Sequence, residues 1–152
     1  MKKIALGTDH AGYRLKEAIK EFLLKEGYEL VDLGTFSEEA VDYTDYVIPA
    51  AEAVVTGQAD CGVVFGGSGN GEAMAANKVK GIRCALCWNE KSAVLAKEHN
   101  NANVIALGGR MVSEEEAIKL VAAWLGANFE NGRHLKRIQK LADYEGYAGP
   151  LV

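Results

Sequence analysis

The sequence predicts an α/β fold: a three-layer, doubly wound (Rossmann-like) sheet of about five parallel strands, with helices on both faces and an additional C-terminal helix. Short apolar segments alternate five times with segments whose apolar residues recur at helical spacing, which is typical of parallel sheets covered by helices. Residues 61–65 are apolar along the whole segment, as in strands that are buried on both faces. Functional loops of such folds lie at the carboxyl ends of the strands, so the polar residues after each strand are the candidates for a site.

Length and composition fit one folded domain. The chain has 152 residues, of which 49% are hydrophobic and 25% are charged, close to the averages of globular domains. We expect one α/β domain over residues 1–143 and a C-terminal tail over 144–152. No apolar run approaches the ~18 residues of a membrane helix, and the first apolar segment is too short for a signal peptide. We therefore expect a cytoplasmic protein. The net charge of −4 argues against nucleic acid as the main partner.

The first half of the chain contains three of the predicted strands. Residues 3–7 form a short, mostly apolar run that ends at a polar cluster, and residues 28–33 and 61–65 also read as strands. Apolar residues between positions 15 and 23 share one helical face. A second helix is predicted over 42–55, where Pro49 predicts either a kink or a late start.

The second half begins with a glycine-rich loop, 66–71, and continues the alternation. Ser113 and Glu116 have capping-box spacing, in which a hydroxyl and a carboxylate satisfy backbone donors at the start of a helix. That helix carries apolar residues at 117, 120, 121 and 124 on one face. The other predicted elements are a helix at 72–79, a strand at 82–87, a helix at 90–98, a strand at 104–107 and a last helix at 133–142.

The cysteines are Cys61, Cys84 and Cys87, and the last two have the C-x-x-C spacing that can indicate a metal or redox site. Their surroundings indicate a buried strand instead, and free cysteines are commonly buried and inert. A zinc site needs about four ligands, whereas each histidine stands alone in the sequence. We therefore expect no metal site. The histidines are His10, His99 and His134.

The first polar cluster follows the first strand. Asp9 and His10, next to Gly12, can bind a polyol or a phosphate and can transfer protons. In the alternative interpretation, Asp9 caps the next helix and His10 is a bystander. The segment by itself favours neither interpretation.

The second polar cluster is the loop 66–71, which has four glycines in six positions and leads into a helix. Its N–H groups can approach a ligand closely, and a helix start favours negative charge. The loop departs from the P-loop and dinucleotide-binding patterns at Glu72 and from the nucleophile elbow at Asn70. N–H donors beside the Glu72 carboxylate suit proton abstraction next to a carbonyl, with the donors holding the developing oxyanion. Alternatively, Glu72 is only a first-turn charge that interacts with the helix dipole.

Further candidates lie later in the chain. His99 follows a helical segment, where either a structural role at the helix terminus or chemistry is possible. Arg110 follows two glycines and can hold an anion. Arg133 and Arg137 are spaced i, i+4, so they form either a solvated basic face or a two-pronged phosphate clamp.

Together these segments resemble the type B ribose-5-phosphate isomerases and their sugar-phosphate isomerase relatives, including the galactose-6-phosphate isomerase subunits. The resemblance extends over nearly the whole chain, and the ordered set is more specific than any one segment. The segments are 9–12, 42–43, 66–72 with 75–78, 81–83, 99–100, 108–110, and 132–134 with Arg137.

The resemblance implies a cofactor-free aldose–ketose isomerase that works through a cis-enediolate. It also implies a homodimer whose site lies between the subunits, with a tetramer left open. Ring opening is assigned to His99, assisted by Asp9 and Ser68. The implied enediolate contacts are the N–H groups of Gly67, Ser68, Gly69, Asn70 and Gly71 and the Asn100 amide. The implied substrate contacts are Asp9, His10, Tyr43 and Arg110 from one subunit and Arg133 and Arg137 from the partner.

One position departs from the commoner family pattern. Many members have a cysteine base where this chain has Gly66, and none of the three cysteines here takes its place. A second branch has glycine at that position and a glutamate at the helix start. The chain resembles this branch, which assigns the proton transfer between C2 and C1 to Glu72, with a pKa raised by burial.

The expected reaction is the interconversion of ribose 5-phosphate and ribulose 5-phosphate. A hexose 6-phosphate is an alternative substrate, because specificity depends on pocket depth. In another class, the chain is a non-catalytic or partner-dependent sugar-phosphate-binding subunit, although the presence of Glu72 and His99 argues against this. A flavodoxin-like or nucleotide-binding module is supported only by the α/β pattern and the glycine loop.

Overall fold

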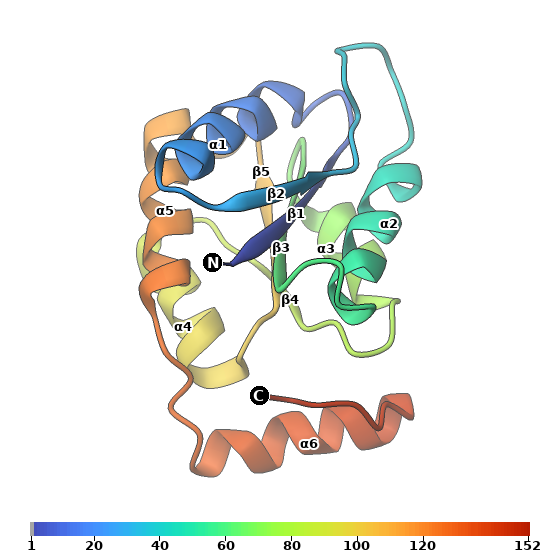
Figure 1. The fold of residues 1–152 in the computed structure, drawn as a ribbon, viewed down its shortest axis with the longest axis vertical. Coiled ribbons are helices and arrows are strands. Elements are labelled where there is room, and N and C mark those ends of the chain that lie inside the picture. Colours follow the sequence, from blue (N-terminus) through green and yellow to red (C-terminus); the bar gives the residue numbers. More distant parts are fainter. Residues whose placement is uncertain (1) are drawn as a thin grey trace.

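The computed structural model describes residues 2–152 and confirms the predicted fold class. Within these residues, five parallel strands form one sheet with the order β2-β1-β3-β5-β4. Helices α1, α4 and α5 cover one face, helices α2 and α3 cover the other, and α6 lies across one end of the sheet (Figure 1). No helix of the described residues is long and apolar enough to cross a membrane.

The elements follow the predicted alternation, with some shifts at their ends. The strands are β1 (Lys3–Thr8), β2 (Glu29–Asp32), β3 (Cys61–Gly66), β4 (Cys84–Leu86) and β5 (Val104–Gly108). The helices are α1 (Tyr13–Lys25), α2 (Thr44–Val55), α3 (Asn70–Asn77), α4 (Glu90–Asn100), α5 (Glu114–Gly126) and α6 (Arg133–Glu145).

Four boundaries correct the sequence analysis. Helix α2 begins at Thr44 instead of position 42 and Pro49 lies inside it, so the alternative in which the proline delays the start is wrong. Helix α3 begins at Asn70 instead of position 72, which places Glu72 in its first turn. Strand β4 has three residues instead of six, because it lies at the edge of the sheet and pairs only with β5. Helix α4 extends to Asn100, so His99 lies in its last turn and does not follow the helix.

The tail also begins later than predicted, because α6 continues to Glu145. The residues after it turn back toward the sheet. The Leu151 carbonyl accepts hydrogen bonds from Arg83 Nη2 at 3.1 Å and from Asn101 Nδ2 at 2.7 Å. These bonds attach the end of the chain beneath the amino ends of the strands.

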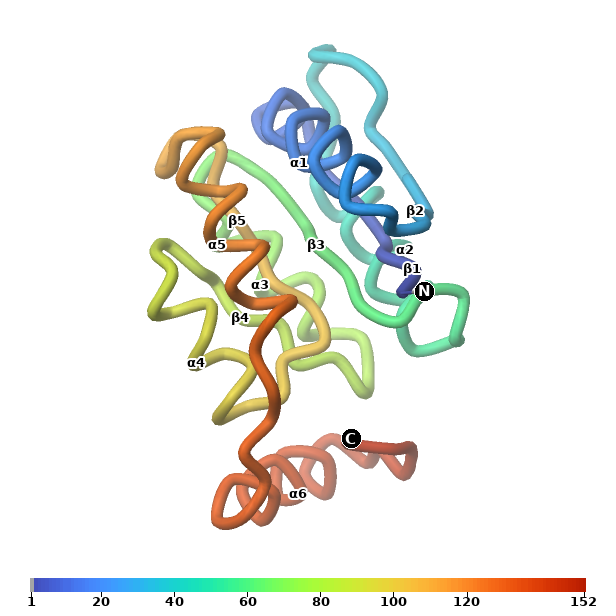
Figure 2. Tube along the Cα trace, turned by 60° about the vertical axis from the view of Figure 1, so that its left-hand side comes forward, coloured from blue at the N-terminus to red at the C-terminus, as the bar shows by residue number. Residues whose placement is uncertain are grey.

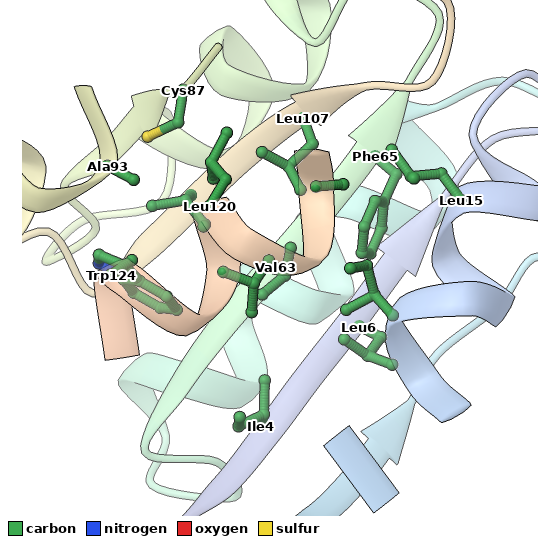
Figure 3. Packing of buried hydrophobic residues seen from close by; sticks show 14 of the residues in the cluster. Ile4, Leu6, Leu15, Val63, Phe65, Cys87, Ala93, Leu107, Leu120 and Trp124 are labelled. Atoms are coloured by element: carbon green, nitrogen blue, oxygen red, sulfur yellow. The ribbon is translucent and has the colours of Figure 1, made fainter. Parts of the chain in front are cut away.

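The two faces of the sheet are packed differently. On the α1, α4 and α5 face, large side chains such as Phe65, Leu107 and Trp124 fill the core (Figure 3). On the α2 and α3 face, the core is rich in alanine, for example Ala50 and Ala76. Small side chains let α3 approach the sheet closely, so the loop before α3 is held against the carboxyl ends of β3 and β5.

Candidate active site

The loop between β3 and α3 is fixed by its glycines and by hydrogen bonds to the loop after β5. Gly69 has φ 85°, a conformation that favours glycine, and a Cβ there would lie 2.6 Å from Leu86 Cδ1. The N–H of Gly109 donates to the Gly66 carbonyl at 2.7 Å, and that of Arg110 donates to the Gly67 carbonyl at 3.0 Å. The two loops therefore form one rigid platform at the carboxyl end of the sheet.

The Glu72 carboxylate lies over the end of β3, in the space that a side chain at position 66 would occupy. A Cβ on Gly66 would lie 1.9 Å from Glu72 Oε1 and 2.1 Å from Cδ. The Glu72 residue is only 4% exposed. A side chain at position 66 and the present Glu72 position therefore exclude each other, which gives the physical reason for Gly66 in this chain.

The environment of Glu72 favours its neutral form. Burial raises the pKa of the Glu72 carboxyl above its ordinary value, and the nearby negative charge of Asp9 raises it further. The backbone N–H groups of Glu72 and Gly69 act in the opposite direction. The predicted upward shift is confirmed, and it is the shift expected of a carboxylate that must both accept and return a proton.

Hydrogen bonds hold Asp9 and His10 in the loop after β1. Asp9 Oδ1 accepts a hydrogen bond from the Gly12 N–H at 3.1 Å. Gly12 itself is the N-cap of α1 and has no side-chain cap, so the interpretation of Asp9 as the helix cap is wrong. His10 Nδ1 accepts from the Val41 N–H at 3.2 Å. A neutral His10 therefore carries its proton on Nε2, which leaves Nε2–H free to donate to a ligand.

A cleft of about 450 Å³ brings most of the predicted residues together. Tyr43 closes one side by lying against the loop, where a Cβ on Gly71 would be 2.7 Å from Tyr43 Cζ. Ser68 Oγ accepts from the Asn70 N–H at 3.2 Å, which helps to order the loop. The sequence analysis missed two lining residues, Ala11 and Met111. The residues of the cleft are Asp9, His10, Ala11, Tyr43, Gly67, Ser68, Gly71, Glu72, Arg110 and Met111.

Six predicted site residues do not line this cleft. Gly69 and Asn70 belong to the loop beside it, whereas the other four lie at the far end of the sheet. His99 and Asn100 are in the last turn of α4, which runs from the carboxyl end of β4 back to the start of β5. They therefore lie at the opposite end of the sheet from Glu72. Arg133 and Arg137 are exposed on α6, which lies at that same end in both views (Figures 1 and 2). Asn100 lines a separate cavity of about 690 Å³ between α6 and the β4 edge.

The expectation that the histidines are isolated is wrong for two of them. The rings of His99 and His134 stack with their centroids 4.3 Å apart. Glu130 lies beside both, and the sequence analysis missed it as well as the role of His134. The i, i+4 spacing of Glu130 and His134 was visible in the sequence, but their meeting with His99 depends on how α6 packs on α4.

The cysteines fit the prediction of unreactive thiols. Cys61 and Cys87 are buried and Cys84 is half-buried, and all three are free. Burial raises the pKa of Cys61 to about 11 and that of Cys87 to about 12, and it also raises the pKa of Cys84. Thiolates, the nucleophilic form, are therefore disfavoured at neutral pH.

Comparison with known proteins identifies the family. The family profile described as "Ribose/Galactose Isomerase" matches residues 4–141. Ribose-5-phosphate isomerase B of Escherichia coli K12 is 45% identical over 145 residues, covering 95% of this chain and 97% of the relative. The Mycobacterium tuberculosis H37Rv protein of the same name is 47% identical over 145 residues, covering 94% and 90%.

Solved structures agree with the sequence relatives. The Clostridium thermocellum ribose-5-phosphate isomerase B superposes with a TM-score of 0.94 at 48% identity, covering 95% of this chain and 97% of that one. The Mycoplasma genitalium ribose-5-phosphate isomerase B, solved with bound ribulose-5-phosphate, superposes with a TM-score of 0.90 at 42% identity, covering 96% and 97%. The chain belongs to the ribose/galactose isomerase family and is an aldose–ketose isomerase.

Proposed function

We propose that this chain interconverts ribose 5-phosphate and ribulose 5-phosphate through a cis-enediolate, with Glu72 as the base. The observation that carries this proposal is the buried Glu72 carboxylate, which lies over the end of β3 next to the N–H groups of the 67–71 loop. The names of the relatives support the choice of substrate, and one of their solved structures holds ribulose-5-phosphate.

Proton transfer and charge stabilisation are divided between these groups. Glu72 takes the proton from C2 of the open-chain aldose and returns it to C1. A second proton passes from the C2 hydroxyl to the C1 oxygen, so that the carbonyl moves from C1 to C2. The oxygen that gains negative charge is held by N–H groups of the loop, and removing one such donor commonly costs ~10²–10³ in rate. The raised pKa of Glu72 favours its protonated state enough to return the proton.

The phosphate is assigned to the hydrogen-bond donors at the rim of the cleft, His10 and Arg110. His10 presents Nε2–H because its Nδ1 is occupied by the Val41 N–H. Arg110 is placed next to the glycine loop by its backbone bond to Gly67. A guanidinium and an imidazole N–H are suitable donors for phosphate oxygens.

Ring opening needs a second copy of the chain. His99 and Asn100 lie at the far end of the sheet from Glu72, so one chain does not place them in its own cleft. We infer a homodimer in which each chain presents His99, Asn100, Arg133 and Arg137 to the cleft of the other. A twofold dimer creates two equivalent sites of this kind. A tetramer built from such dimers is compatible with the same sites.

The substrate assignment is tested by a coupled assay of the purified chain. Ribose 5-phosphate, allose 6-phosphate and galactose 6-phosphate are compared with EDTA present. We expect kcat/KM of ~10⁴ M⁻¹s⁻¹ or more for ribose 5-phosphate, at the low end for working enzymes. Turnover of a hexose phosphate alone would keep the mechanism and change the substrate. Since sugar phosphates of this kind are intracellular metabolites, we also place the enzyme in the cytoplasm.

A further inference from the structure

Three side chains with metal-ligating atoms meet at the amino end of the sheet, outside the cleft. They come from the last turn of α4 (His99), the connection between α5 and α6 (Glu130) and the first turn of α6 (His134). Glu130 Oε2 lies 3.5 Å from His134 Nε2 and 4.0 Å from His99 Nε2. One ligand atom of each residue lies within 4.8 Å of the others.

The backbone holds this cluster in place. The Glu130 N–H donates to the Glu98 carbonyl at 3.0 Å, and the His134 N–H donates to the Asn131 carbonyl at 3.0 Å. The two imidazole rings are stacked with an interplanar angle of 13°. Both Nε2 atoms therefore lie on the side of the stack where the Glu130 carboxylate is.

One atom of the cluster is a buried polar atom without a hydrogen-bond partner among the described residues. The His134 side chain is 6% exposed, and its Nε2 has no hydrogen-bond partner among residues 2–152. Such atoms are rare, because leaving a buried donor or acceptor unsatisfied is costly. A ligand that binds both this nitrogen and the Glu130 carboxylate would supply the missing partner.

We propose that His99, Glu130 and His134 form a binding site for a divalent transition-metal ion such as Zn²⁺, with a water molecule in the fourth position. Two imidazoles and a carboxylate are ligands that Zn²⁺ accepts. Bonds of ~2.0–2.1 Å place tetrahedral ligand atoms about 3.4 Å apart. The 3.5 Å pair already fits this spacing. The longer pair can close because the His99 and Glu130 side chains are 37% and 50% exposed.

Occupancy of the site has a consequence that rests on the proposed function. A metal ion bound to His99 Nε2 prevents this imidazole from transferring protons in ring opening, the role that we assign to it in the cleft of the other chain. Zn²⁺ is then an inhibitor of the isomerase, and its removal restores the rate. The metal site itself does not depend on this assignment.

Metal titrations test the site directly. The purified chain is titrated with Zn²⁺ by calorimetry and with Co²⁺ by visible absorption, beside the variants Glu130→Gln, His134→Asn and Cys87→Ser. We expect one ion per chain and a tetrahedral Co²⁺ spectrum. Loss of an outer-shell partner alone commonly costs 10–100-fold in metal affinity, so loss of a ligand should cost at least ~10-fold. Cys87→Ser is the matched control for thiol binding and should leave the affinity unchanged.

The outcomes separate the site from the proposed function. Absence of one-to-one binding would overturn the site. Binding that Glu130→Gln leaves intact would also overturn it, and loss of binding in Cys87→Ser would assign the metal to a thiol. Glu130→Gln decides the case if the buried His134 variant fails to fold, because Glu130 is half exposed. Inhibition is measured as each variant's rate with Zn²⁺ relative to its own rate with EDTA. Metal binding without inhibition would overturn the assignment of His99 to ring opening. An enzyme that is inactive without metal would overturn the proposed function. In that case the titration would still show whether the metal site exists.

Discussion

The two ends of the sheet carry the two halves of the proposed site, and they are constructed differently. At the carboxyl end, Glu72 and His10 are placed by loops that directly follow β3 and β1. At the amino end, His99 and His134 meet because α6 packs against α4, although they are 35 positions apart (134 − 99) in the sequence. The first half is a local consequence of strand ends, whereas the second depends on tertiary packing. Breaking each end separately therefore distinguishes chemistry from positioning.

The largest effect is expected for Glu72→Gln, which removes the proposed base and keeps the shape of the side chain. General bases commonly contribute 10²–10⁴-fold, so kcat for ribose 5-phosphate should fall by ~10²–10⁴. Substrate affinity and fold should be kept, as measured by calorimetric binding and circular dichroism. Turnover near that of the wild type would remove Glu72 from the base role.

A smaller loss is expected for Gly66→Ala, which leaves Glu72 in the chain but displaces its carboxylate. The new Cβ would lie 1.9 Å from Glu72 Oε1, so the carboxylate must move. Since a shift of ~1 Å can cost about 10²-fold, kcat should fall by roughly that factor. The matched control is Gly126→Ala, because a Cβ at Gly126 has nothing within 4 Å. Equal rates for both variants would contradict the exclusion between position 66 and Glu72.

Mixed dimers test whether the two ends meet across subunits. Glu72→Gln and His99→Asn subunits, each inactive alone, are mixed, exchanged and assayed. An equal mixture contains half heterodimers, each with one intact site of two, so about one quarter of the wild-type activity should return. Unchanged inactivity in mixtures shown by mass spectrometry to contain heterodimers would mean that each site belongs to one chain.

The smallest expected effect is a pH-dependent change of stability at Glu72. Its folded-state pKa is raised above its ordinary value of 4.5, so the folded chain holds this proton more tightly than the unfolded chain does. The stabilising contribution is therefore complete below pH ~4.5 and is lost as the pH rises through the folded-state pKa. Glu72→Gln should therefore raise Tm at pH 7, and each 1 kcal/mol corresponds to ~2–4 °C for a chain of this size.

Calorimetry at pH 4 and pH 7 checks this sign. The difference between Glu72→Gln and the wild type should vanish at the lower pH. In kinetics, the same shift predicts that kcat falls as the pH drops through the raised pKa of Glu72. A Tm difference that is largest at pH 4 would contradict the upward shift.

Most of the carboxyl-end site could be predicted from the sequence, because strand ends and the residues after them are adjacent in the chain. Alternating apolar segments placed Asp9, His10 and Glu72 at the same sheet edge, where parallel strands end together. Boundaries were less accurate, since the edge strand β4 and the ends of α3 and α6 depend on pairing and capping by distant residues. His99 is separated from Glu72 because α4 runs from the carboxyl end of the sheet back to its amino end. The sequence analysis did not use this direction of the helix.

By itself, the sequence determined the order of strands and helices and the chemistry of the glycine loop. These are local properties: apolar periodicity specifies an element, and Gly66 and Glu72 are six positions apart (72 − 66). Only the tertiary structure decided that the Glu72 carboxylate occupies the space above Gly66 and that His99, Glu130 and His134 converge. The physical reason is that these contacts join segments that are distant in the chain, or depend on side-chain directions that are set by packing. Local spacing in the sequence determines neither which distant segments meet nor where a side chain points.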